Sequence, residues 1–266
     1  MVRVGASSTR AAVVAGMCAL ATLTVPSPTW GEGTAQGASK MTPTATPTAT
    51  PTSKSKKVDC AQVKCIALTF DDGPGQQAGR LLDTFKKYKA RATFLLEGQY
   101  VKARPQFVKR MVEEGHQIGN HSYDHPDFTK LDDEAIRTQI GNTQELVHDI
   151  TGKYPTVLRP PYGLGDYRVQ AIATEYGLPI VLWNTTSHDW ATKNEKAIYR
   201  EVLKGARRDS IVLMHDWVTQ TVDVMPDLLK ALRKKGFHIV TVHSLLRGKT
   251  LDPGEVFPKD ARTSVE

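Results

Sequence analysis

The chain has 266 residues, a formal net charge of +7 and 40% hydrophobic residues. Once the terminal segments are set aside, this length allows one domain with a single hydrophobic core. The basic balance favours an anionic environment such as a cell-wall polymer, with nucleic acid as the competing partner. Because the sequence holds no nucleic-acid-binding motif and its basic residues are scattered over helical patterns, we expect no nucleic-acid function.

Residues 1–38 are predicted to be a signal peptide. Arg3 and Arg10 give a positive start, and the apolar run 11–25 is too short to span a bilayer comfortably. A retained membrane anchor is one alternative, and Cys18 raises a lipoprotein signal as another. We therefore expect a secreted or cell-wall-associated protein that keeps no stable membrane span after signal removal.

Residues 39–58 are predicted to be a disordered linker. Its central part, 42–52, contains only threonine, proline and alanine, which cannot bury a core. Such a segment is expected to act as an extended tether between the export signal and the domain that follows.

Cysteine usage agrees with export. If Cys18 leaves with the signal peptide, Cys60 and Cys65 remain as an even pair. In an oxidising compartment this pair predicts a disulfide bond, and two free thiols are the alternative.

The domain itself is predicted to cover residues 59–248, with a C-terminal tail at 249–266 and a monomeric state. Apolar strands are predicted to begin near residues 64, 92, 116, 157, 180, 211 and 238. Helical patterns lie between them at 79–89, 105–114, 132–151, 167–176, 195–207 and 222–235. This alternation predicts a parallel α/β architecture, and the count of seven strands favours a barrel over an open sheet.

Two groups of polar residues indicate a metal site. Asp71 and Asp72 end the apolar strand 66–70, and adjacent residues in extended backbone point in opposite directions, so the two carboxylates can reach different partners. The alternative is a solvated turn. His121 and His125 lie in a predicted loop, and two imidazoles with one carboxylate leave coordination positions open on a zinc-like ion.

Three further segments place polar residues of catalytic type at strand ends. Arg159 follows a short apolar pair, Asp189 comes soon after the strand at 180, and His215 ends the strand at 211. Tyr162 could present a main-chain N–H to a developing oxyanion. In an α/β barrel, the carboxyl ends of the strands and the loops after them build the active site.

The runs T-F-D-D-G, H-S-x-x-H, R-P-P-Y-G, D-W and L-x-H, in this order, resemble the five motifs of the polysaccharide deacetylases. These are the NodB-homology enzymes of carbohydrate esterase family 4, and the resemblance covers roughly residues 64–246. It implies a distorted (β/α)7 barrel that removes acetyl groups from an N- or O-acetylated glycan. It also implies a divalent metal cofactor, zinc or cobalt.

The resemblance further implies a role for each motif residue. Asp72, His121 and His125 would bind the metal. Asp71 would be the general base, oriented by Arg159, and His215 would be the general acid, supported by Asp189. The N–H of Tyr162 would hold the oxyanion, and Trp190 and Leu213 would line the pocket. One departure is visible, because Thr186 stands where the family often has an acid.

Several functions stay open at this point. Peptidoglycan N-acetylglucosamine and chitin oligomers are the two expected substrates. An acetylxylan esterase would use the same groups, and an inactive glycan-binding module would keep the fold without the chemistry. An iron oxygenase can also use two histidines and one carboxylate.

Overall fold

The computed structural model describes residues 58–261, which all belong to one compact unit. The predicted signal peptide and all but the last residue of the predicted linker lie outside this range. Among the described residues, no helix combines the length and the apolar character that a membrane span requires.

The structure alternates strands and helices along the chain. The strands are β1 Lys64–Gly73, β2 Thr93–Leu96, β3 Gln117–Asn120, β4 Ile180–Val181, β5 Thr185–Thr186, β6 Ser210–His215, β7 Phe237–Val240 and β8 Val256–Phe257. The helices are α1 Ala78–Lys87, α2 Gly98–Ala103, α3 Pro105–Glu113, α4 Asp133–Thr151, α5 Tyr167–Glu175, α6 Asp189–Thr192, α7 Glu195–Gly205, α8 Thr219–Lys234 and α9 Val242–Leu245, with short 3₁₀ helices at Phe128–Lys130 and Pro161–Gly163.

All strand pairs in the described part are parallel, which confirms the predicted α/β class. The main sheet has the order β3-β2-β1-β6-β5, and β7 pairs with the first residues of β1. Leu158 forms isolated parallel β-bridges with Asn120 at the end of β3 and with Ile180 at the start of β4, so it links these two strands. β8 pairs with β4. Among the described strands, hydrogen bonds do not close the sheet into a complete barrel, because β4 and β5 are not paired with each other. The chain itself joins the two ends, because β4 and β5 are successive parts of the segment 180–186.

The strand predicted near residue 157 is reduced to the bridges at Leu158. Pro155, Pro160 and Pro161 flank it, and each proline lacks the N–H that a sheet ladder needs. The apolar segment after residue 180 also differs from a single strand, because it divides into β4 and β5. Beyond residue 248, β8 packs on β4, with the Leu182 N–H donating to the Phe257 carbonyl at 2.8 Å.

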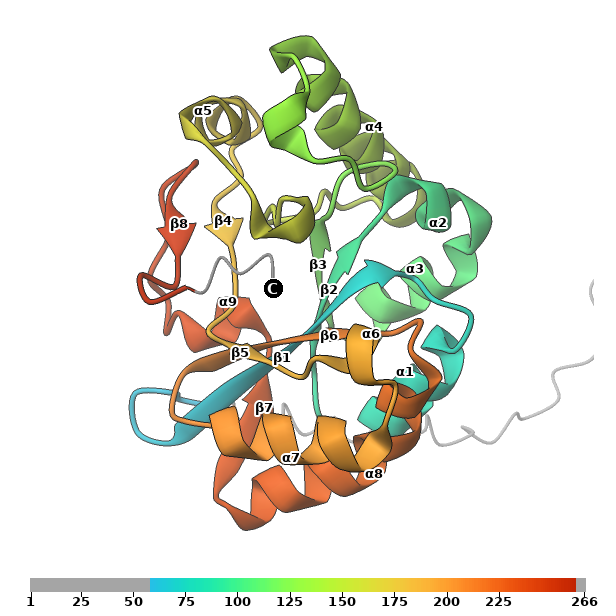
Figure 1. The fold of residues 1–266 in the computed structure, drawn as a ribbon, viewed down its shortest axis with the longest axis vertical. Coiled ribbons are helices and arrows are strands. Elements are labelled where there is room, and N and C mark those ends of the chain that lie inside the picture. Colours follow the sequence, from blue (N-terminus) through green and yellow to red (C-terminus); the bar gives the residue numbers. More distant parts are fainter. Residues whose placement is uncertain (1–57, 262–266) are drawn as a thin grey trace, which may run out of the picture. The chain divides into compact units, whose positions relative to one another are not determined.

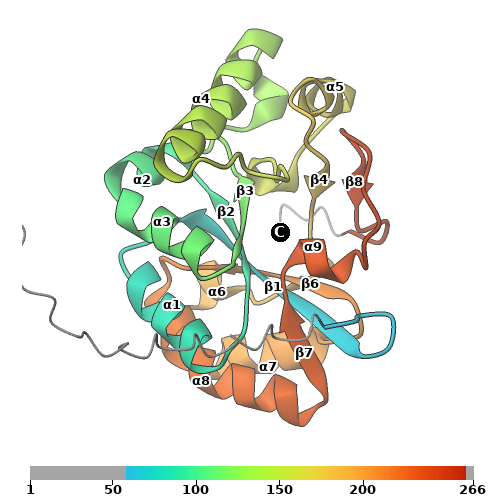
Figure 2. The same ribbon diagram turned by 180° about the vertical axis from the view of Figure 1, so that it is seen from behind.

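The longer helices lie where the sequence pattern predicts them. α4 is an example: the side chain of Asp132 caps its N-terminus and Gly152 ends it with φ 69°. The short helices α2, α6 and α9 were not predicted, because four to six residues are too few to display a helical period. Figures 1 and 2 show α7 and α8 side by side along one side of the strands, and α4 and α5 on the opposite side.

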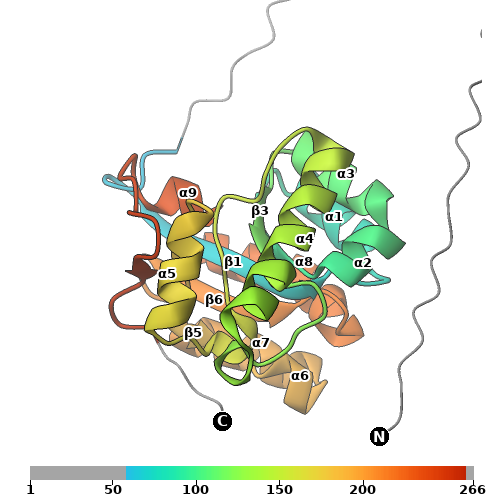
Figure 3. The same ribbon diagram turned by 90° about the horizontal axis from the view of Figure 1, so that it is seen from above.

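β1 lies at the centre of the packing. Figure 3 shows it running beneath α4 and α5, and all its residues from Cys65 to Asp71 are buried. A disulfide bond joins Cys65 to Cys60 just before the strand, as the even cysteine count leads us to expect. The strand is therefore held at its start and carries Asp71 and Asp72 at its other end.

Candidate active site

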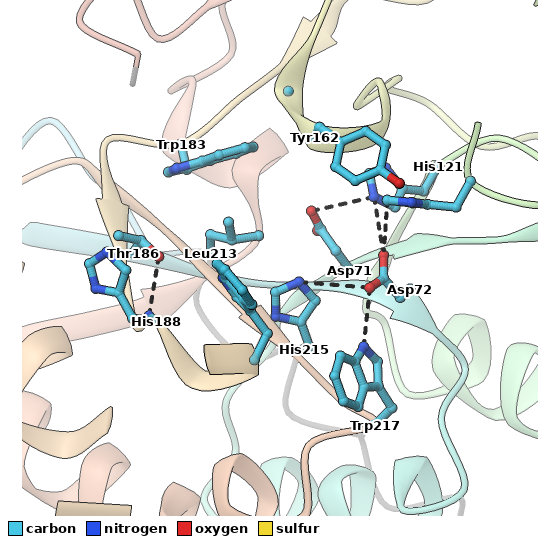
Figure 4. A pocket seen from close by; sticks show the side chains of 13 residues that line it. Asp71, Asp72, His121, Tyr162, Trp183, Thr186, His188, Leu213, His215 and Trp217 are labelled. Carbon is cyan, nitrogen blue, oxygen red and sulfur yellow. Dashed lines mark hydrogen bonds and ion pairs between the residues drawn. The ribbon is translucent and has the colours of Figure 1, made fainter. Parts of the chain in front are cut away.

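The polar residues singled out in the sequence gather at the carboxyl end of the parallel strands, around a pocket of about 450 Å³. Figure 4 shows the side chains converging on this space. The pocket is lined by Asp71, Asp72, His121, His125, Tyr162, Gly163, Trp183, Thr186, His188, Trp190, Leu213, His215 and Trp217. Arg159 and Asp189 do not line it and instead lie buried behind Asp71 and His215.

Asp71 and Asp72 do reach different partners, but for a different reason from the one predicted. The pairing of β1 with β2 shifts register after Phe70, and Asp72 has φ 61°, outside extended backbone. A local bulge, rather than the alternation of a regular strand, therefore separates the two carboxylates. Asp71 turns toward Arg159, and Asp72 turns toward the histidines.

The buried Arg159 holds Asp71 in place. Its Nη1 donates to Asp71 Oδ1 at 2.7 Å and to the Thr69 hydroxyl at 2.9 Å, while Nε and Nη2 donate to the carbonyls of Val181 and Leu182 at 2.8 and 3.0 Å. Every nitrogen of the guanidinium thus has a partner. A rigid, fully hydrogen-bonded cation keeps the Asp71 carboxyl group oriented toward the pocket.

His121, His125 and Asp72 form a compact group. Asp72 Oδ1 lies 3.3 Å from His121 Nε2 and 3.5 Å from His125 Nε2. His121 Nδ1 is 2.6 Å from the Arg159 carbonyl and donates to it, so Nε2 is the ring nitrogen that faces Asp72. The two histidines lie in irregular chain after β3, as predicted.

The pKa values in this group follow from burial and mutual charge. Burial alone would raise the pKa of Asp72, but the neighbouring charges of His121, His215 and His125 outweigh it and hold that pKa well below its usual range. Burial, reinforced by the charge of His121, lowers the pKa of His125 to about 4. A carboxylate beside an uncharged imidazole is the form in which both can bind a metal ion.

The donor set fits a divalent cation. Asp72 Oδ1 is buried and has no hydrogen-bond partner among the described residues, although such an oxygen normally costs free energy if left unsatisfied. It lies at the meeting point of two imidazole nitrogens, and the three ligand atoms are all within 4.8 Å of one another. Two nitrogens and one oxygen suit zinc or a similar ion and leave coordination positions open.

His215 is held by Asp189. Asp189 Oδ1 accepts from His215 Nδ1 at 2.8 Å, and Oδ2 accepts from the His215 N–H at 2.8 Å and from the Thr221 hydroxyl at 2.6 Å. Burial alone would lower the pKa of His215, but the hydrogen bond and charge of Asp189 outweigh it and raise that pKa to about 9. The Nε2 side of the ring is 3.8 Å from Asp72 Oδ2, so it faces the pocket and can present a proton there.

The pocket walls are aromatic and apolar. Trp190 and Leu213 line it as predicted, and the Tyr162 ring packs edge-on against His125 with centroids 4.6 Å apart. Sequence reasoning missed Trp183 and Trp217, which line the same space. Their only signal is proximity to a motif, since Trp217 lies two residues after His215.

Backbone strain is concentrated around the pocket. The described residues include nine non-glycine positions with positive φ, and five of them belong to the pocket or its metal-ligand loop. These five are Asp72, Ser122, His125, Tyr162 and His188, with φ between 52° and 70°. Left-handed backbone is costly for residues with a Cβ and persists where the surroundings enforce it, commonly at functional sites.

Two buried carboxyl groups that the sequence did not reveal lie near the turn after β1, and Asp216 bonds to it. Both side-chain oxygens of Asp216 accept the Gly75 N–H at 2.9 Å, and burial raises the pKa of Asp216 to about 7. Burial also raises the pKa of Glu97 to about 7, and Gln99 donates to its side chain at 2.6 Å. Asp216 thereby fastens the residues that follow Asp72.

Comparison with known proteins agrees with this geometry. A sequence profile of the family described as polysaccharide deacetylase matches residues 59–181. The peptidoglycan-N-acetylglucosamine deacetylase PgdA of Listeria monocytogenes is 42% identical over 195 residues, which are 73% of this chain and 41% of that protein. The peptidoglycan-N-acetylmuramic acid deacetylase PdaC of Bacillus subtilis is 37% identical over 194 residues, 72% of this chain and 40% of that protein.

The chain thus spans about two fifths of the length of these curated relatives. A solved structure of T48 deacetylase with substrate superposes with a TM-score of 0.73 at 40% sequence identity. That similarity covers 76% of this chain and 100% of the solved chain, so it includes the whole of a known deacetylase fold.

Proposed function

The chain belongs to the polysaccharide deacetylase family, the family 4 carbohydrate esterases, and on that premise we propose that it is an exported, metal-dependent glycan N-deacetylase. The observation that carries the proposal is the unpartnered Asp72 oxygen between His121 and His125, with Asp71 and His215 at its sides. The names of the relatives support peptidoglycan as the substrate, and chitin oligomers offer the same N-acetyl sugar. The basic net charge and the predicted signal peptide suit an anionic cell wall.

Asp72, His121 and His125 would hold the ion, with zinc or cobalt as the candidates. When bound, it would polarise the acetyl carbonyl and acidify the attacking water. Asp71 would take the proton of that water as the C–O bond forms, since Arg159 holds its carboxyl group beside the pocket. The Tyr162 N–H would donate to the developing oxyanion.

His215 would supply the proton that the leaving nitrogen needs. An amine is a poor leaving group unless it is protonated as the C–N bond breaks. Asp189 holds Nδ1, so the other ring nitrogen can serve as the donor toward the pocket. Trp190 and Leu213 would enclose the acetyl methyl group. The products are acetate and a free amino sugar.

An acetylxylan esterase would use the same groups, because an ester needs the acid less than an amide does. An inactive glycan-binding module is disfavoured, because the proposed base, acid and all three metal ligands are present and in mutual contact range. Acetate release from N-acetylglucosamine oligomers, peptidoglycan and acetylated xylan would separate these functions.

The decisive experiment combines metal analysis with acetate release. We expect one zinc or cobalt ion per chain in the wild type, and loss of both the ion and turnover in His125→Ala. His148→Ala is the matched control, since His148 lies with Glu145 and Asp149 in an exposed group on α4 that also has metal-ligand spacing. Full metal retention in His125→Ala, or equal loss in His148→Ala, would contradict the assigned ligands.

A further inference from the structure

Two basic runs that are far apart in the sequence meet in the fold. One is 86–89 at the end of α1, and the other is 233–235 at the end of α8. Arg233 joins them, because its Nη2 donates to the Tyr88 carbonyl and its guanidinium lies 5.9 Å from the centre of the Tyr88 ring. Six exposed cations surround Tyr88, and we call them the basic cluster. They are Lys86, Lys87, Lys89, Arg233, Lys234 and Lys235.

The basic cluster has little acidic charge to balance it. Lys86 lies 4.0 Å from Glu114, whose carboxylate is already paired with Arg110 at 2.6 Å. Both acids of α8 also pair with cations outside the cluster, at 2.7 and 3.1 Å. These pairs are Asp223 with Arg80 and Asp227 with Lys230. Five of the six cations in the cluster therefore have no ion pair with a described residue.

Helix geometry accounts for only part of the cluster. The C-terminal partial charge of a helix stabilises cations in its last turn, which explains the four members that lie on α1 and α8 themselves. Lys89 and Lys235 lie beyond these helices. The meeting of the two helix ends also sets like charges side by side, which is unfavourable. An anion bound to the cluster would relieve this repulsion.

A hollow of about 560 Å³ continues the basic surface between α7 and α8. Lys234 belongs both to this hollow and to the basic cluster. The lining runs along α8 from Val224 to Lys234, which is about 15 Å at 1.5 Å per residue. Its charged lining consists of Lys196, Lys230 and Lys234 against Glu195 and Asp227. We call the cluster and this hollow together the basic face.

The opposite side of the molecule has the reverse charge balance. Segments 78–91, 195–208 and 222–235, which contain α1, α7 and α8, hold 14 basic and five acidic residues. Segment 132–177, which contains α4 and α5, holds four basic and seven acidic residues. Figures 1 and 2 show α7 and α8 across the strands from α4 and α5. The net positive charge is thus gathered on one side, where it produces a directed field.

The chemistry of the basic face fits a linear chain of phosphate groups. Lysine ammonium groups on flexible stems bind phosphates as point charges, and an extended groove can follow successive charges along a chain. A membrane surface fits less well, because membrane-binding faces combine basic residues with exposed aromatic or aliphatic side chains. In the part of the chain that the structure describes, the exposed large hydrophobic side chains all lie outside α1, α7 and α8.

The basic face lies away from the active site. α1 precedes β2 and α8 precedes β7, so both helices end near the start of the strands, whereas the pocket lies at their carboxyl end. The hollow between α7 and α8 shares no lining residue with the pocket. A polymer bound to the basic face therefore leaves the pocket open to a glycan.

We propose that the basic face binds a linear anionic polymer of phosphodiester units in the cell wall and so holds the enzyme among its glycan substrates. The inference goes beyond the proposed function and rests on it only for the export to the wall. Binding is carried by charge, so it weakens as salt screens the cations. Hydrolysis of a soluble substrate does not require it.

The test measures binding and turnover separately, with the zinc-loaded full chain. Sedimentation with insoluble peptidoglycan, before and after its phosphodiester polymers are removed, gives the affinity for each wall. Acetate release from a soluble N-acetylglucosamine tetramer gives the turnover. We expect the wild type to bind the phosphate-bearing wall about tenfold more tightly than the stripped wall. That affinity should fall about tenfold between about 50 mM and about 500 mM NaCl.

Two matched variants locate the binding surface. The first removes four charges from the basic cluster and should lose about tenfold in affinity for the phosphate-bearing wall, with tetramer turnover within about twofold of the wild type. It carries Lys87→Gln, Lys89→Gln, Lys234→Gln and Lys235→Gln. The control removes four exposed lysines elsewhere, so it has the same net charge, and should bind as the wild type. It carries Lys102→Gln, Lys153→Gln, Lys249→Gln and Lys259→Gln.

Each outcome supports or contradicts a defined part of the inference. Equal losses in both variants would contradict the basic cluster, because net charge alone would explain them. Tighter binding to anionic lipid vesicles or to a DNA duplex than to the phosphate-bearing wall would contradict the partner. If the cluster variant does not fold, a wild-type affinity that is independent of salt still contradicts the inference.

The same measurements distinguish this inference from the proposed function. A wild type that releases acetate but binds both walls equally contradicts the basic face alone. A wild type that prefers the phosphate-bearing wall but releases no acetate contradicts the deacetylase activity alone.

Discussion

The two ends of the parallel strands are built for opposite purposes. At the carboxyl end, Asp71 and Asp72 are separated by a bulge, and one oxygen of Asp72 has no hydrogen-bond partner among the described residues. At the start of β1, Cys65 is disulfide-bonded to Cys60, and Arg208 donates to the carbonyls of Cys60 and Ala61 at 2.7 Å. Five of the positive-φ residues thus gather around the pocket at one end, and a covalent bond with added hydrogen bonds restrains the chain at the start of β1.

The same contrast appears in the neighbouring strands. His116, just before β3, accepts the Ala92 N–H at Nδ1 and packs edge-on against Phe85 and Phe94 at 5.6 and 5.3 Å. His121, just after β3, faces two carboxylates instead. One strand of four residues therefore separates a structural histidine from a proposed metal ligand. The comparison teaches that the end of the strand at which a histidine lies decides its surroundings, aromatic packing at the start and carboxylates at the carboxyl end.

The largest expected effect is at the carboxyl end, on turnover. Asp71→Asn and His215→Ala should each lower turnover of an N-acetyl substrate roughly 100- to 10,000-fold, the range typical of general acid–base groups. On an aryl acetate, whose leaving group needs no proton, His215→Ala should recover much of its activity while Asp71→Asn stays slow. Steady-state kinetics on both substrates measures this.

Metal analysis provides the control for that prediction. Both variants should keep their ion, because neither side chain is a proposed ligand. If both variants are impaired equally on the two substrates, the division into base and acid is wrong. If Asp71→Asn loses the ion, its role as an unligated base is wrong.

At the opposite end, His116 should make the stability depend on pH. Burial lowers the pKa of His116 to about 4, against an ordinary value of 6.5, so below pH 6.5 the unfolded state binds more protons than the folded state. The contribution of His116 to the free energy of unfolding is complete above pH 6.5. It falls as the pH drops toward 4, by at most about 3 kcal/mol.

Urea unfolding between pH 7 and 4 measures that dependence. His116→Gln keeps a hydrogen-bond acceptor for Ala92 without titrating, so its free energy of unfolding should fall less steeply than that of the wild type. The matched control is His148→Gln, at a partly exposed position on α4, which should keep the wild-type slope. An unchanged slope in His116→Gln would contradict the assignment.

The smallest effect is expected from the disulfide bond. It closes a loop with a sequence separation of 5, so chain-entropy reasoning gives about 2 kcal/mol for its contribution to the free energy of unfolding. The double variant Cys60→Ser with Cys65→Ser should lose about that amount in urea unfolding and keep its turnover. A large loss of activity would show that the start of β1 controls the site at its far end.

Local patterns in the sequence determined the alternation of strands and helices and the set of polar residues at the strand ends. Hydrophobic periodicity and capping residues act over a few positions, so helices such as α4 could be predicted closely. The run around Asp71 and Asp72 and the spacing of His121 and His125 likewise carry their chemistry in neighbouring residues.

Only the tertiary structure decided which distant groups meet. Arg159 reaches Asp71 across 88 positions and Asp189 reaches His215 across 26, because the strand ends converge at one edge of the fold. Trp217 belongs to no motif, and its Nε1 reaches Asp72 across 145 positions because the chain after β6 packs against the turn after β1. Such contacts depend on the packing of whole elements, and no spacing along the chain encodes them.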